Sequence, residues 1–413
     1  MAVERIIVGI DIGTTKICTL IGQVDDNDSL HVIGIGVVPA RGLRRGVVTD
    51  IEAASQAVGE SVDKAERVAG QTVTQAWVGV GGSHISSQNN RGVVSIGRGD
   101  RPVDRDDIER VMESARTITM PHNRRIIHSL PRQFIIDDQD GIKNPLGLMG
   151  FRLEVEAHIV TGAVTSIQNL VRCVESNGIQ VVDIVLQPLA SSEAVLTDAE
   201  KKMGVVLVDM GGGTTDVAIH VEGSAWETIV FPIGGNHITN DIAIGLRMPY
   251  AAAEEIKIRY AHASPSVDNE RELIEVATFG DENLRTISRA ELCKLVVART
   301  EEMFSYISRE VKRSGLDSLL PAGVVLTGGT ASLTGIRDLA ARTLQVPVRI
   351  GAPRRLRGLV EAVSSPAYAT GVGLLLWGQK AQDVLSDDES GVQRAGTWHD
   401  RLSRLFKLLL PRS

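Results

Sequence analysis

The sequence predicts an α/β protein with mixed sheets, made of two related halves and a small inserted α+β domain. Strand-like and helical segments alternate along most of the chain, which is typical of this fold class. One strand–turn–strand motif occurs twice, and residues 84–161 interrupt the alternation with their own strands and helix. The 413 residues, 43% hydrophobic and 23% charged, are enough for several domains and are typical of a folded globular protein.

The first part of the chain predicts a meander of antiparallel strands. Short runs rich in β-forming residues cover 5–10, 16–24 and 30–38, and Gly, Thr, Asp and Asn separate them. A helix follows over 50–69, where apolar residues recur at helical spacing as far as Gly70.

A strand over 73–80 leads into the inserted segment. Polar turns in the insert separate a helix from three strands, and these elements cover 92–96 (strand), 104–118 (helix), 124–137 (strand) and 151–160 (strand). We interpret this segment as a small α+β domain.

The alternation then resumes with a helix over 163–176, a strand over 179–186 and a short helix from Pro188. It continues to residue 378 and includes a long helix over 288–313. This order predicts a sheet in each half.

Two segments of the chain share one pattern. The run VGIDIGTTK at 8–16 is followed, 198 residues later (Asp209 against Asp11), by LVDMGGGTTD at 207–216. In each, an apolar strand ends in Asp, turns through Gly and Thr, and continues as a second strand. The pattern predicts an internal duplication.

The turns of these hairpins predict a phosphate site. Gly allows close backbone approach, and the N–H groups and Thr hydroxyls of a tight turn suit phosphate oxygens. The Asp at each strand end can hold a hydrated Mg²⁺, which keeps its waters and takes one or two carboxylates. One copy would predict only an ordinary turn, but two facing copies predict a clamp for a nucleotide with Mg²⁺.

A third glycine cluster, VVLTGGTA at 324–331, also ends an apolar strand before a helix. Backbone exposed there can lie against a flat base and ribose. The chain has no GxxxxGK[ST] and no GxGxxG that opens a βαβ unit, so a P-loop and a Rossmann site are excluded.

Composition argues against other classes of function. The net charge of −7 argues against a dedicated nucleic-acid binder. Cys18, Cys173 and Cys293 are far apart and form no CxxC pair, which argues against disulfides and zinc and favours a reducing cytoplasm. The nine histidines show no metal-ligand spacing, so no metal beyond Mg²⁺ is expected.

The end of the chain predicts a membrane contact rather than a membrane span. The longest apolar stretch, 368–378, is shorter than the roughly 20 residues of a spanning helix, and no export signal precedes the first strand. Residues 380–396 predict a flexible linker. Residues 397–413 predict an amphipathic helix with net charge +3, against −10 for the rest of the chain.

Packing onto the body is the simpler interpretation for an average terminal helix. Here the preceding linker, the gathering of aromatic residues and the cationic face favour reversible attachment to anionic lipids. The side chains expected at the membrane are the apolar Trp398, Leu402, Leu405, Phe406 and Leu409 and the basic Arg401, Arg404 and Lys407.

The three glycine motifs, in this order, resemble the two phosphate motifs and the adenosine motif of the actin/Hsp70/sugar-kinase ATPase superfamily. The insert lies where the FtsA family of bacterial division proteins carries an extra domain, and PLASS at 188–192 and GGNHITNDIA at 234–243 resemble FtsA sequences. The resemblance covers nearly the whole chain, including hinge-like helices at 187–196 and 365–377. It implies duplicated actin-like ATPase (ribonuclease H-like) domains with an inserted α+β domain.

The resemblance also implies a division of the chain. The parts are lobe 1 (subdomain 1A) from 1–83, 162–196 and 365–379, the insert (1C) from 84–161, subdomain 2A from 197–234 and 316–364, subdomain 2B from 235–315, the linker 380–396 and the membrane-targeting helix 397–413.

Site roles follow from the same resemblance. Asp11 and Asp209 lie on the Mg²⁺ side, through water, and Lys16 neutralises phosphate charge. Gln187 stands where relatives place a residue that positions water, and the expectation is ATP binding with weak hydrolysis at most. The other residues expected around the nucleotide are Gly13, Thr14, Thr15, Gly211, Gly212, Gly213, Thr214 and Thr215 at the phosphates and Gly235, Asn236, Glu254, Lys257, Gly328, Gly329 and Thr330 at the adenosine.

FtsA proteins polymerise on the cytoplasmic face of the cell membrane, anchor the tubulin-like FtsZ of the Z-ring at the division septum and recruit other divisome proteins. The resemblance implies the same role here, as a peripheral membrane protein. Subdomain 2B receives the FtsZ tail in FtsA. Its basic residues here are either the docking site or an ordinary solvated face, and they are Arg285, Arg289, Lys294 and Arg299.

Three alternatives stay open. A small-molecule kinase of the same superfamily needs a catalytic carboxylate in the interlobe cleft and has no use for the tail. An Hsp70-like chaperone needs a peptide-binding domain after residue 378, where 35 residues follow. A PilM-like pilus-assembly adaptor shares the fold and the insert but generally lacks the amphipathic tail.

Overall fold

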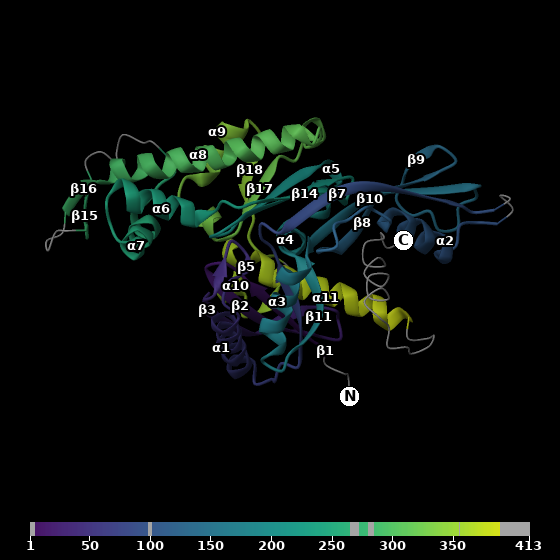
Figure 1. Ribbon diagram of the computed structural model, residues 1–413, viewed down its shortest axis with the longest axis horizontal. Helices are drawn as coiled ribbons and strands as arrows, with labels where there is room; N and C mark the ends of the chain where they lie inside the picture. The colour runs from purple at the N-terminus through teal and green to yellow at the C-terminus, as the bar shows by residue number, and fades with distance from the viewer. Residues whose placement is uncertain (1–4, 98–100, 265–271, 280–284, 355, 389–413) are drawn as a thin grey trace.

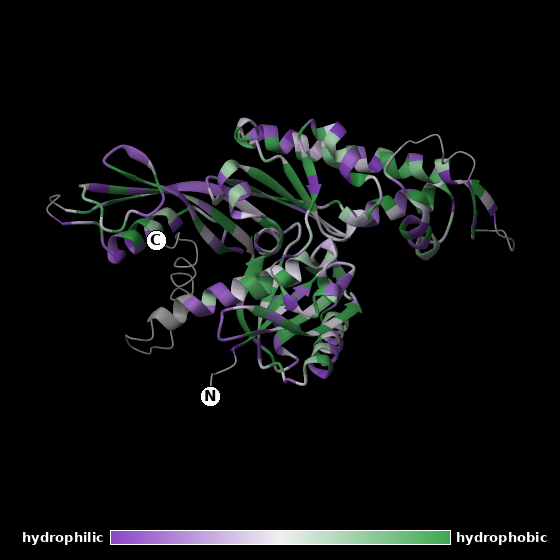
Figure 2. Cartoon of the chain, turned by 180° about the vertical axis from the view of Figure 1, so that it is seen from behind, coloured by the Kyte–Doolittle hydropathy of each residue, from purple (hydrophilic) through white to green (hydrophobic). Residues whose placement is uncertain are grey.

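A computed structural model describes residues 5–97, 101–264, 272–279, 285–354 and 356–388. Lobe 1 and lobe 2 each contain a sheet of their own and lie one above the other in Figure 1, and the insert projects to one side of lobe 2. The sheets of both lobes are largely hydrophobic, whereas the strands of the insert carry many hydrophilic residues (Figure 2).

Lobe 1 has a six-stranded sheet with the order β11-β6-β1-β2-β3-β19. The first three strands form the predicted antiparallel meander, and β6, β11 and β19 join it in parallel. The sequence places residues 357–358 in subdomain 2A, but β19 pairs with β3, so the chain returns to lobe 1 earlier than expected. The strands of lobe 1 are β1 (Arg5–Ile12), β2 (Lys16–Val24), β3 (Leu30–Pro39), β4 (Leu43–Arg44), β5 (Val47–Val48), β6 (Gln75–Val80), β11 (Gln180–Leu186) and β19 (Arg357–Gly358).

Helices cover both faces of this sheet, because successive side chains of β1 alternate between two cores. Val8, Ile10 and Ile12 pack toward α1 and α3, whereas Ile7 packs toward α4 and α11. Asp11 has the same parity as Ile7, so it ends its strand on the α4 and α11 face. The helices of lobe 1 are α1 (Ile51–Ala69), α3 (Val164–Glu175), α4 (Gln187–Val195), α10 (Val360–Val363) and α11 (Ala369–Asp388), with the 3-10 turn η4 (Pro366–Tyr368).

Lobe 2 has a five-stranded sheet with the order β14-β13-β12-β17-β18. Its strands are β12 (Val205–Met210), β13 (Thr215–Val221), β14 (Ser224–Phe231), β17 (Val324–Thr327) and β18 (Val348–Ile350), and β15 (Leu273–Val276) pairs separately with β16 (Arg285–Ser288). Its helices are α5 (Asp198–Met203), α6 (Gly235–Gly245), α7 (Tyr250–Tyr260), α8 (Arg289–Arg313) and α9 (Ile336–Leu344), with the 3-10 turns η2 (Asp317–Leu319) and η3 (Gly329–Ser332).

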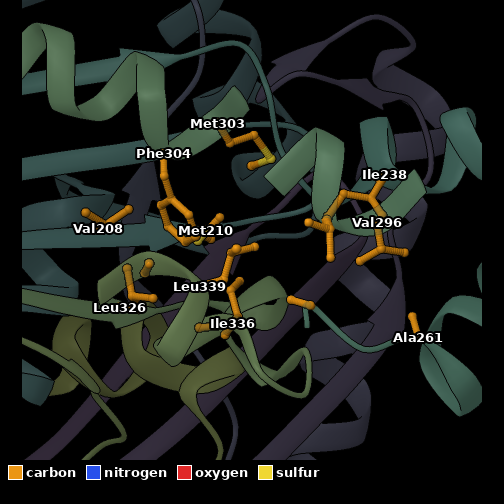
Figure 3. Close-up of a cluster of buried hydrophobic side chains, with 14 of the residues drawn as sticks. Val208, Met210, Ile238, Ala261, Val296, Met303, Phe304, Leu326, Ile336 and Leu339 are labelled. Atoms are coloured by element: carbon orange, nitrogen blue, oxygen red, sulfur yellow. The ribbon is translucent and has the colours of Figure 1, made fainter. Parts of the chain in front are cut away.

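The core of lobe 2 determines which way the second aspartate faces. Val208 and Met210 of β12 point into this core, near Phe304 of α8 and Leu339 of α9 (Figure 3). Asp209, between them, therefore points to the opposite face of the sheet. Helix α4 contacts both sheets there. Each lobe thus ends one strand with a carboxylate that faces the same layer between the lobes.

The insert is a four-stranded antiparallel sheet with the order β7-β10-β8-β9 and one helix on its face. Its elements are β7 (Ile85–Ser95), α2 (Arg105–Arg116), β8 (Arg124–Ile136), β9 (Gln139–Ile142) and β10 (Arg152–Ala163). The sequence predicts the first strand only from residue 92, because 85–91 are mostly polar. Pairing with β10 along its whole length extends β7 back to Ile85. The short strand β9 is not predicted either.

The insert leaves lobe 1 after β6 but docks on β14, the edge strand of lobe 2. Ser87 Oγ donates to Thr228 O at 2.7 Å, and His158 Nε2 lies 2.9 Å from Thr228 Oγ1. The Arg132 guanidinium lies over the Trp226 ring, 4.1 Å from its centroid. The insert is therefore attached to one lobe by the chain and to the other by side chains.

Helix α11 is longer than the sequence predicts. The linker expected from residue 380 is wrong for its first part, because α11 continues to Asp388. Polar side chains there bond to the body: Asp383 pairs with Arg5 at 2.6 Å, and Lys380 pairs with Glu193. Residues 389–396 and the membrane helix expected over 397–413 lie outside the described residues. Among the helices that the structure describes, none has the length and hydropathy to cross a bilayer.

Candidate functional site

The two predicted glycine turns have the same strand register. Hairpin 1 is formed by β1 and β2, and hairpin 2 by β12 and β13. Asp11 lies opposite Cys18 in the first, and Asp209 lies opposite Asp216 in the second. In each turn the first residue donates its N–H to the carbonyl of the fourth, at 3.0 Å in hairpin 1 and 2.9 Å in hairpin 2. The duplication read from the sequence thus extends to backbone hydrogen bonding.

The tips of the hairpins meet between the lobes. A Cβ on Gly213 would lie 2.6 Å from Thr14 Oγ1, and one on Gly212 would overlap the Thr15 side chain. Glycine fits at both positions because any larger residue would meet a threonine side chain of hairpin 1. Gly46 N donates to Thr14 Oγ1 at 3.0 Å and holds that side chain in place. Four of the expected phosphate contacts are therefore brought together.

Helices α4 and α11 hold the strand-end carboxylates. Asp11 Oδ1 accepts from Gln187 Nε2 at 2.9 Å. Asp209 Oδ2 accepts from the hydroxyl of Ser191 and, at 3.2 Å, from that of Thr370. Burial raises the pKa of Asp11 to about 6, and burial also raises the pKa of Asp209. Gln187, expected to position water, is here a partner of the first carboxylate.

Asp216 is a third buried carboxylate at this place. Its Oδ2 accepts from Thr214 Oγ1 at 2.9 Å, and its buried Oδ1 has no hydrogen-bond partner among the described residues. Burial and, next, repulsion from Asp209 raise the pKa of Asp216 to about 8. A hydrated divalent cation would oppose this repulsion and offer the missing donor, so the residues fit Mg²⁺ held through water. Within the described ranges, no three His, Cys, Asp or Glu side chains are grouped to bind a metal directly.

Lys16 occupies the fourth position of the first turn. Its Nζ lies 3.7 Å from the centroid of the Tyr368 ring, a cation–π contact. Tyr368 is the last residue of η4 and directly precedes α11. In the part of the chain that the structure describes, Lys16 forms no ion pair within 4 Å.

A cavity of about 310 Å³ opens beside the hairpin tips, within the size range of small-molecule sites. Its wall combines both tips, the start of α6, one face of α7 and the third glycine cluster. The expected nucleotide residues that line it are Thr15, Gly212, Gly235, Asn236, Glu254, Lys257, Gly329 and Thr330.

Backbone hydrogen bonds hold the cavity wall against hairpin 2. Gly235 N and Asn236 N, at the start of α6, donate to Gly211 O at 2.9 Å and to Gly212 O at 2.8 Å. Thr330 Oγ1, from the third glycine cluster, donates to Gly211 O at 3.0 Å. The turn of hairpin 2 thus joins two walls of the cavity.

Two expected contacts lie behind this wall. Thr215 is buried and donates to Ile233 O at 2.8 Å. Gly328 has φ +84°, and a Cβ there would overlap Asp209. Both residues shape the backbone of the site, and neither lines the cavity.

Glu254 and Lys257 form a polar network on α7. They pair at 2.7 Å, as their spacing of three residues predicts. Lys257 Nζ also donates to Thr239 Oγ1 at 2.9 Å and to Gly235 O at 3.3 Å. A hydroxyl-bearing ligand in the cavity would meet an acceptor and a donor that are already oriented.

Comparison with known proteins identifies the family. Residues 206–373 match the family described as cell division protein FtsA, and residues 82–161 match the SHS2 domain inserted in FtsA. The chain is 46% identical over 388 residues to the cell division protein FtsA of Pseudomonas aeruginosa, which covers 94% of this chain and 93% of that protein. The identity to the FtsA of Escherichia coli K12 is 34% over 412 residues, which covers 97% of each chain.

The chain belongs to the FtsA family of cell division proteins. A further relative, the FtsA of Bacillus subtilis, is 40% identical over 372 residues, which covers 90% of this chain and 83% of that protein. This membership removes the kinase, chaperone and pilus-adaptor alternatives as the identity of the chain.

Solved structures confirm the actin-like ATPase fold of this FtsA-family chain. The PilM-PilN type IV pilus biogenesis complex matches with a TM-score of 0.66 at 16% identity, which covers 90% of this chain and 98% of that chain. MreB5 of Spiroplasma citri bound to ADP matches with a TM-score of 0.57 at 15% identity, which covers 94% and 99%. At such identities the likeness shows the fold alone.

The four basic residues of the FtsZ docking hypothesis differ in their surroundings. Arg289 donates to Tyr260 O at 2.7 Å and pairs with Glu272 at 2.6 Å. Arg299 pairs with Asp241 of α6 at 2.5 Å. Two of the four charges are therefore used within lobe 2. The exposed members are Arg285 and Lys294.

Four residues of the site are not assigned from the sequence. Ser191 lies in the PLASS segment, and Asp216 ends the second repeat, so both were within motifs that could have shown them. Tyr368 and Thr370 lie in a segment whose only visible feature is an apolar helix. Only its folding against the hairpins brings these two side chains to the site.

Proposed function

We propose that this FtsA-family protein binds ATP with Mg²⁺ between its lobes, polymerises on the cytoplasmic face of the cell membrane and anchors FtsZ filaments there. The peripheral protein would act at the division septum, where other divisome proteins join the Z-ring. The observation that carries the nucleotide part is the close meeting of two equivalent hairpins beside a cavity of about 310 Å³.

The phosphates would lie between the two hairpin tips. Gly212 and Gly213 lie beside the side chains of Thr14 and Thr15, so backbone N–H groups of lobe 2 and hydroxyls of lobe 1 would both offer donors to one chain of phosphates. Lys16 supplies the positive charge on the side of lobe 1. Because both lobes bind the same ligand, its presence favours a closed arrangement of the lobes, which is the form proposed to make filament contacts.

The cation and the adenosine have separate places. Bound Mg²⁺ would supply positive charge to the phosphate oxygens, and Asp11 and Asp209 would accept from its water shell. The adenosine would occupy the cavity between the start of α6 and the third glycine cluster, with Glu254 and Lys257 toward its hydroxyls. MreB5, a neighbour in fold, is described as bound to ADP and to AMPPNP, which supports this placement.

Hydrolysis would be weak. Gln187 can position a water molecule only after it releases Asp11, to which it donates at 2.9 Å. The nucleotide therefore serves mainly to set the arrangement of the lobes, and the protein acts as an adaptor.

The FtsZ contact is proposed at the end of lobe 2 that carries β15 and β16. Arg285 on β16 is exposed, and Leu273 on the paired strand β15 is 66% exposed. The register pairs Leu273 with Ser288 and Arg285 with Val276, so the two exposed groups lie on opposite faces of this small sheet. The basic group by itself suits a peptide with acidic side chains.

Co-sedimentation with anionic liposomes tests the adaptor role. With Mg-ATP present, the full-length protein is expected to carry FtsZ into the pellet, because the amphipathic segment at 397–413 binds lipid and many tails on one filament bind with higher avidity. A chain truncated at Gly396 is expected to leave FtsZ in the supernatant. Leu405→Asp is the matched control, because it keeps the length of the tail and places a charge on its apolar face.

Each negative result has its own meaning. If the full-length protein pellets without FtsZ, the lipid assignment holds and the partner is wrong. If the protein itself stays in the supernatant, the tail is not a membrane segment. If Leu405→Asp pellets as the unaltered chain does, the contact with lipid is not made by the apolar face.

A further inference from the structure

Lys16 lies on the same face of hairpin 1 as the carboxylate of Asp11, but the two side chains do not pair. In an antiparallel hairpin, side chains two residues apart lie on one face, so Lys16 shares the face of Cys18. Cys18 is directly opposite Asp11, and Asp11 is on that face as well. The flexible Lys16 side chain is therefore free to turn toward a buried carboxylate, yet its ammonium lies over the Tyr368 ring, 3.7 Å from the centroid.

The turn that carries Tyr368 is held by the other lobe. Pro366, at the start of η4, accepts from Gly328 N at 3.1 Å and from Thr327 Oγ1 at 3.2 Å, both at the end of β17. Tyr368 N donates to Ser365 O at 3.0 Å and closes the turn. The end of β17 and the third glycine cluster of lobe 2 thus anchor the turn from which the Tyr368 ring reaches the lysine of lobe 1.

An ion pair between Lys16 and Asp11 would disable the site in two ways. It would place the ammonium on a carboxylate assigned to the water shell of Mg²⁺, and it would remove that ammonium from the phosphates. In a buried place such a pair is strong, because little water screens it. An aromatic face attracts the ammonium without neutralising it and so leaves its charge available.

We propose that Tyr368 is a positioning residue for nucleotide binding, whose ring keeps Lys16 at the phosphate place and off Asp11. The proposal rests on the ATP site proposed above. Tyr368 acts through Lys16, so its effect belongs to ligands that carry phosphates and not to adenosine.

Titrations with Mg-ATP and with adenosine test this role. Tyr368→Leu is expected to weaken Mg-ATP binding by about five- to thirtyfold, the range of a cation–π contact in a partly buried place, and to leave adenosine binding unchanged. Tyr368→Phe keeps the ring and is the matched control, with affinities expected within about twofold of the unaltered protein. In a Lys16→Met background, Tyr368→Leu is expected to have no further effect.

A pentafluorophenylalanine at position 368 covers the case in which Tyr368→Leu fails to fold. This ring keeps the shape of Phe but reverses the charge of the aromatic face, so it is expected to weaken Mg-ATP binding while adenosine binding stays unchanged. Equal affinity of the Phe and pentafluoro variants for Mg-ATP would overturn the proposal.

Other outcomes separate this proposal from the proposed function. If the unaltered protein binds neither Mg-ATP nor adenosine, the ATP site itself is wrong. If the unaltered protein binds both and Tyr368→Leu weakens both equally, the ring has only a structural role. A full effect of Tyr368→Leu in the Lys16→Met background would show that the ring does not act through the lysine.

Discussion

Hairpin 1 and hairpin 2 have one backbone and two different sets of charges. The fourth position of the turn is Lys16 in the first and Thr214 in the second. The residue opposite the strand-end aspartate is Cys18 in the first and Asp216 in the second. Hairpin 1 therefore carries one carboxylate and one ammonium, whereas hairpin 2 carries two carboxylates. The comparison teaches that the two lobes share one backbone hairpin, whereas the side chains on it give lobe 1 the ammonium and lobe 2 the additional carboxylate.

Removal of the carboxylate at the end of β12 is expected to have the largest effect. Asp209→Ala should lower the affinity for Mg-ATP on the order of 100-fold, because this carboxylate is the one that Ser191 and Thr370 hold for the water shell of the cation. Titration of the variant with Mg-ATP measures this loss of affinity. Asp338→Ala, at an exposed carboxylate of α9, is the control and should bind as the unaltered protein does. Unchanged binding by Asp209→Ala would make the site assignment wrong.

The close approach of the hairpin tips can be broken from the side of lobe 2. Gly213→Ala is expected to weaken Mg-ATP binding by about tenfold, because the added Cβ would lie 2.6 Å from Thr14 Oγ1 and push the lobes apart. Gly79→Ala is the comparison, since it adds a Cβ that also touches site residues, Gln187 and Thr370, but at ordinary contact distances of 3.5 Å. Thr14→Ala, which removes the clashing group, should restore part of the loss. No recovery in this double variant would argue against the steric explanation.

Asp216, the carboxylate with no equivalent in hairpin 1, should make the stability of the nucleotide-free protein depend on pH. Burial and the nearby Asp209 raise the pKa of Asp216 from 3.8 to about 8, so the folded chain binds this proton more tightly than the unfolded chain. The stability due to this group is thus present at low pH and is lost as the pH rises through about 8. Asp216→Asn replaces the titrating carboxyl and so removes this pH-dependent loss of stability. Its free energy of unfolding is expected to exceed that of the unaltered protein by about 1–3 kcal/mol at pH 9 and to equal it at about pH 4.

Urea unfolding without Mg²⁺ measures this difference. Cys18→Ser, at the equivalent position of hairpin 1, should show no such trend between about pH 5 and 8, because burial raises the pKa of the Cys18 thiol to about 12 and it stays protonated. A gain from Asp216→Asn that is the same at every pH would mean that the carboxyl is not the titrating group.

Removal of the side-chain hydrogen bonds that hold each turn to its own lobe is expected to have the smallest effects. Thr14→Val leaves Gly46 N without its acceptor and should cost about 1 kcal/mol of unfolding free energy. Thr330→Val should cost about 0.5 kcal/mol, because Gly211 O keeps the hydrogen bond from Gly235 N. Chemical denaturation of both variants gives the two values, and the reverse order would contradict the proposed difference between the two hydrogen bonds.

Features that depend on neighbouring residues could be predicted from the sequence. The hairpins, the long helix α8 and the pair of Glu254 with Lys257 follow from local spacing, and all three occur in the structure. Features that depend on distant partners could not. The polar start of β7 is a strand only because β10 lies beside it, and α11 passes residue 380 only because its polar side chains reach Arg5 and Glu193. Tyr368 joins the site for the same reason.

The position of α11 has a consequence for the time at which the site forms during synthesis. Hairpin 1 is among the first parts of the chain to leave the ribosome, but Tyr368 and Thr370 are made roughly 350 residues later. At about 5–20 residues per second, this interval lasts roughly 20–70 s. The strands of lobe 1 therefore wait for the helix that packs on β1. A chain that stops before η4 and α11 has the first turn without the ring proposed to position its lysine, and it has Asp209 without the Thr370 hydroxyl. If the proposed site is right, a chain binds Mg-ATP at full strength only after α11 has been made.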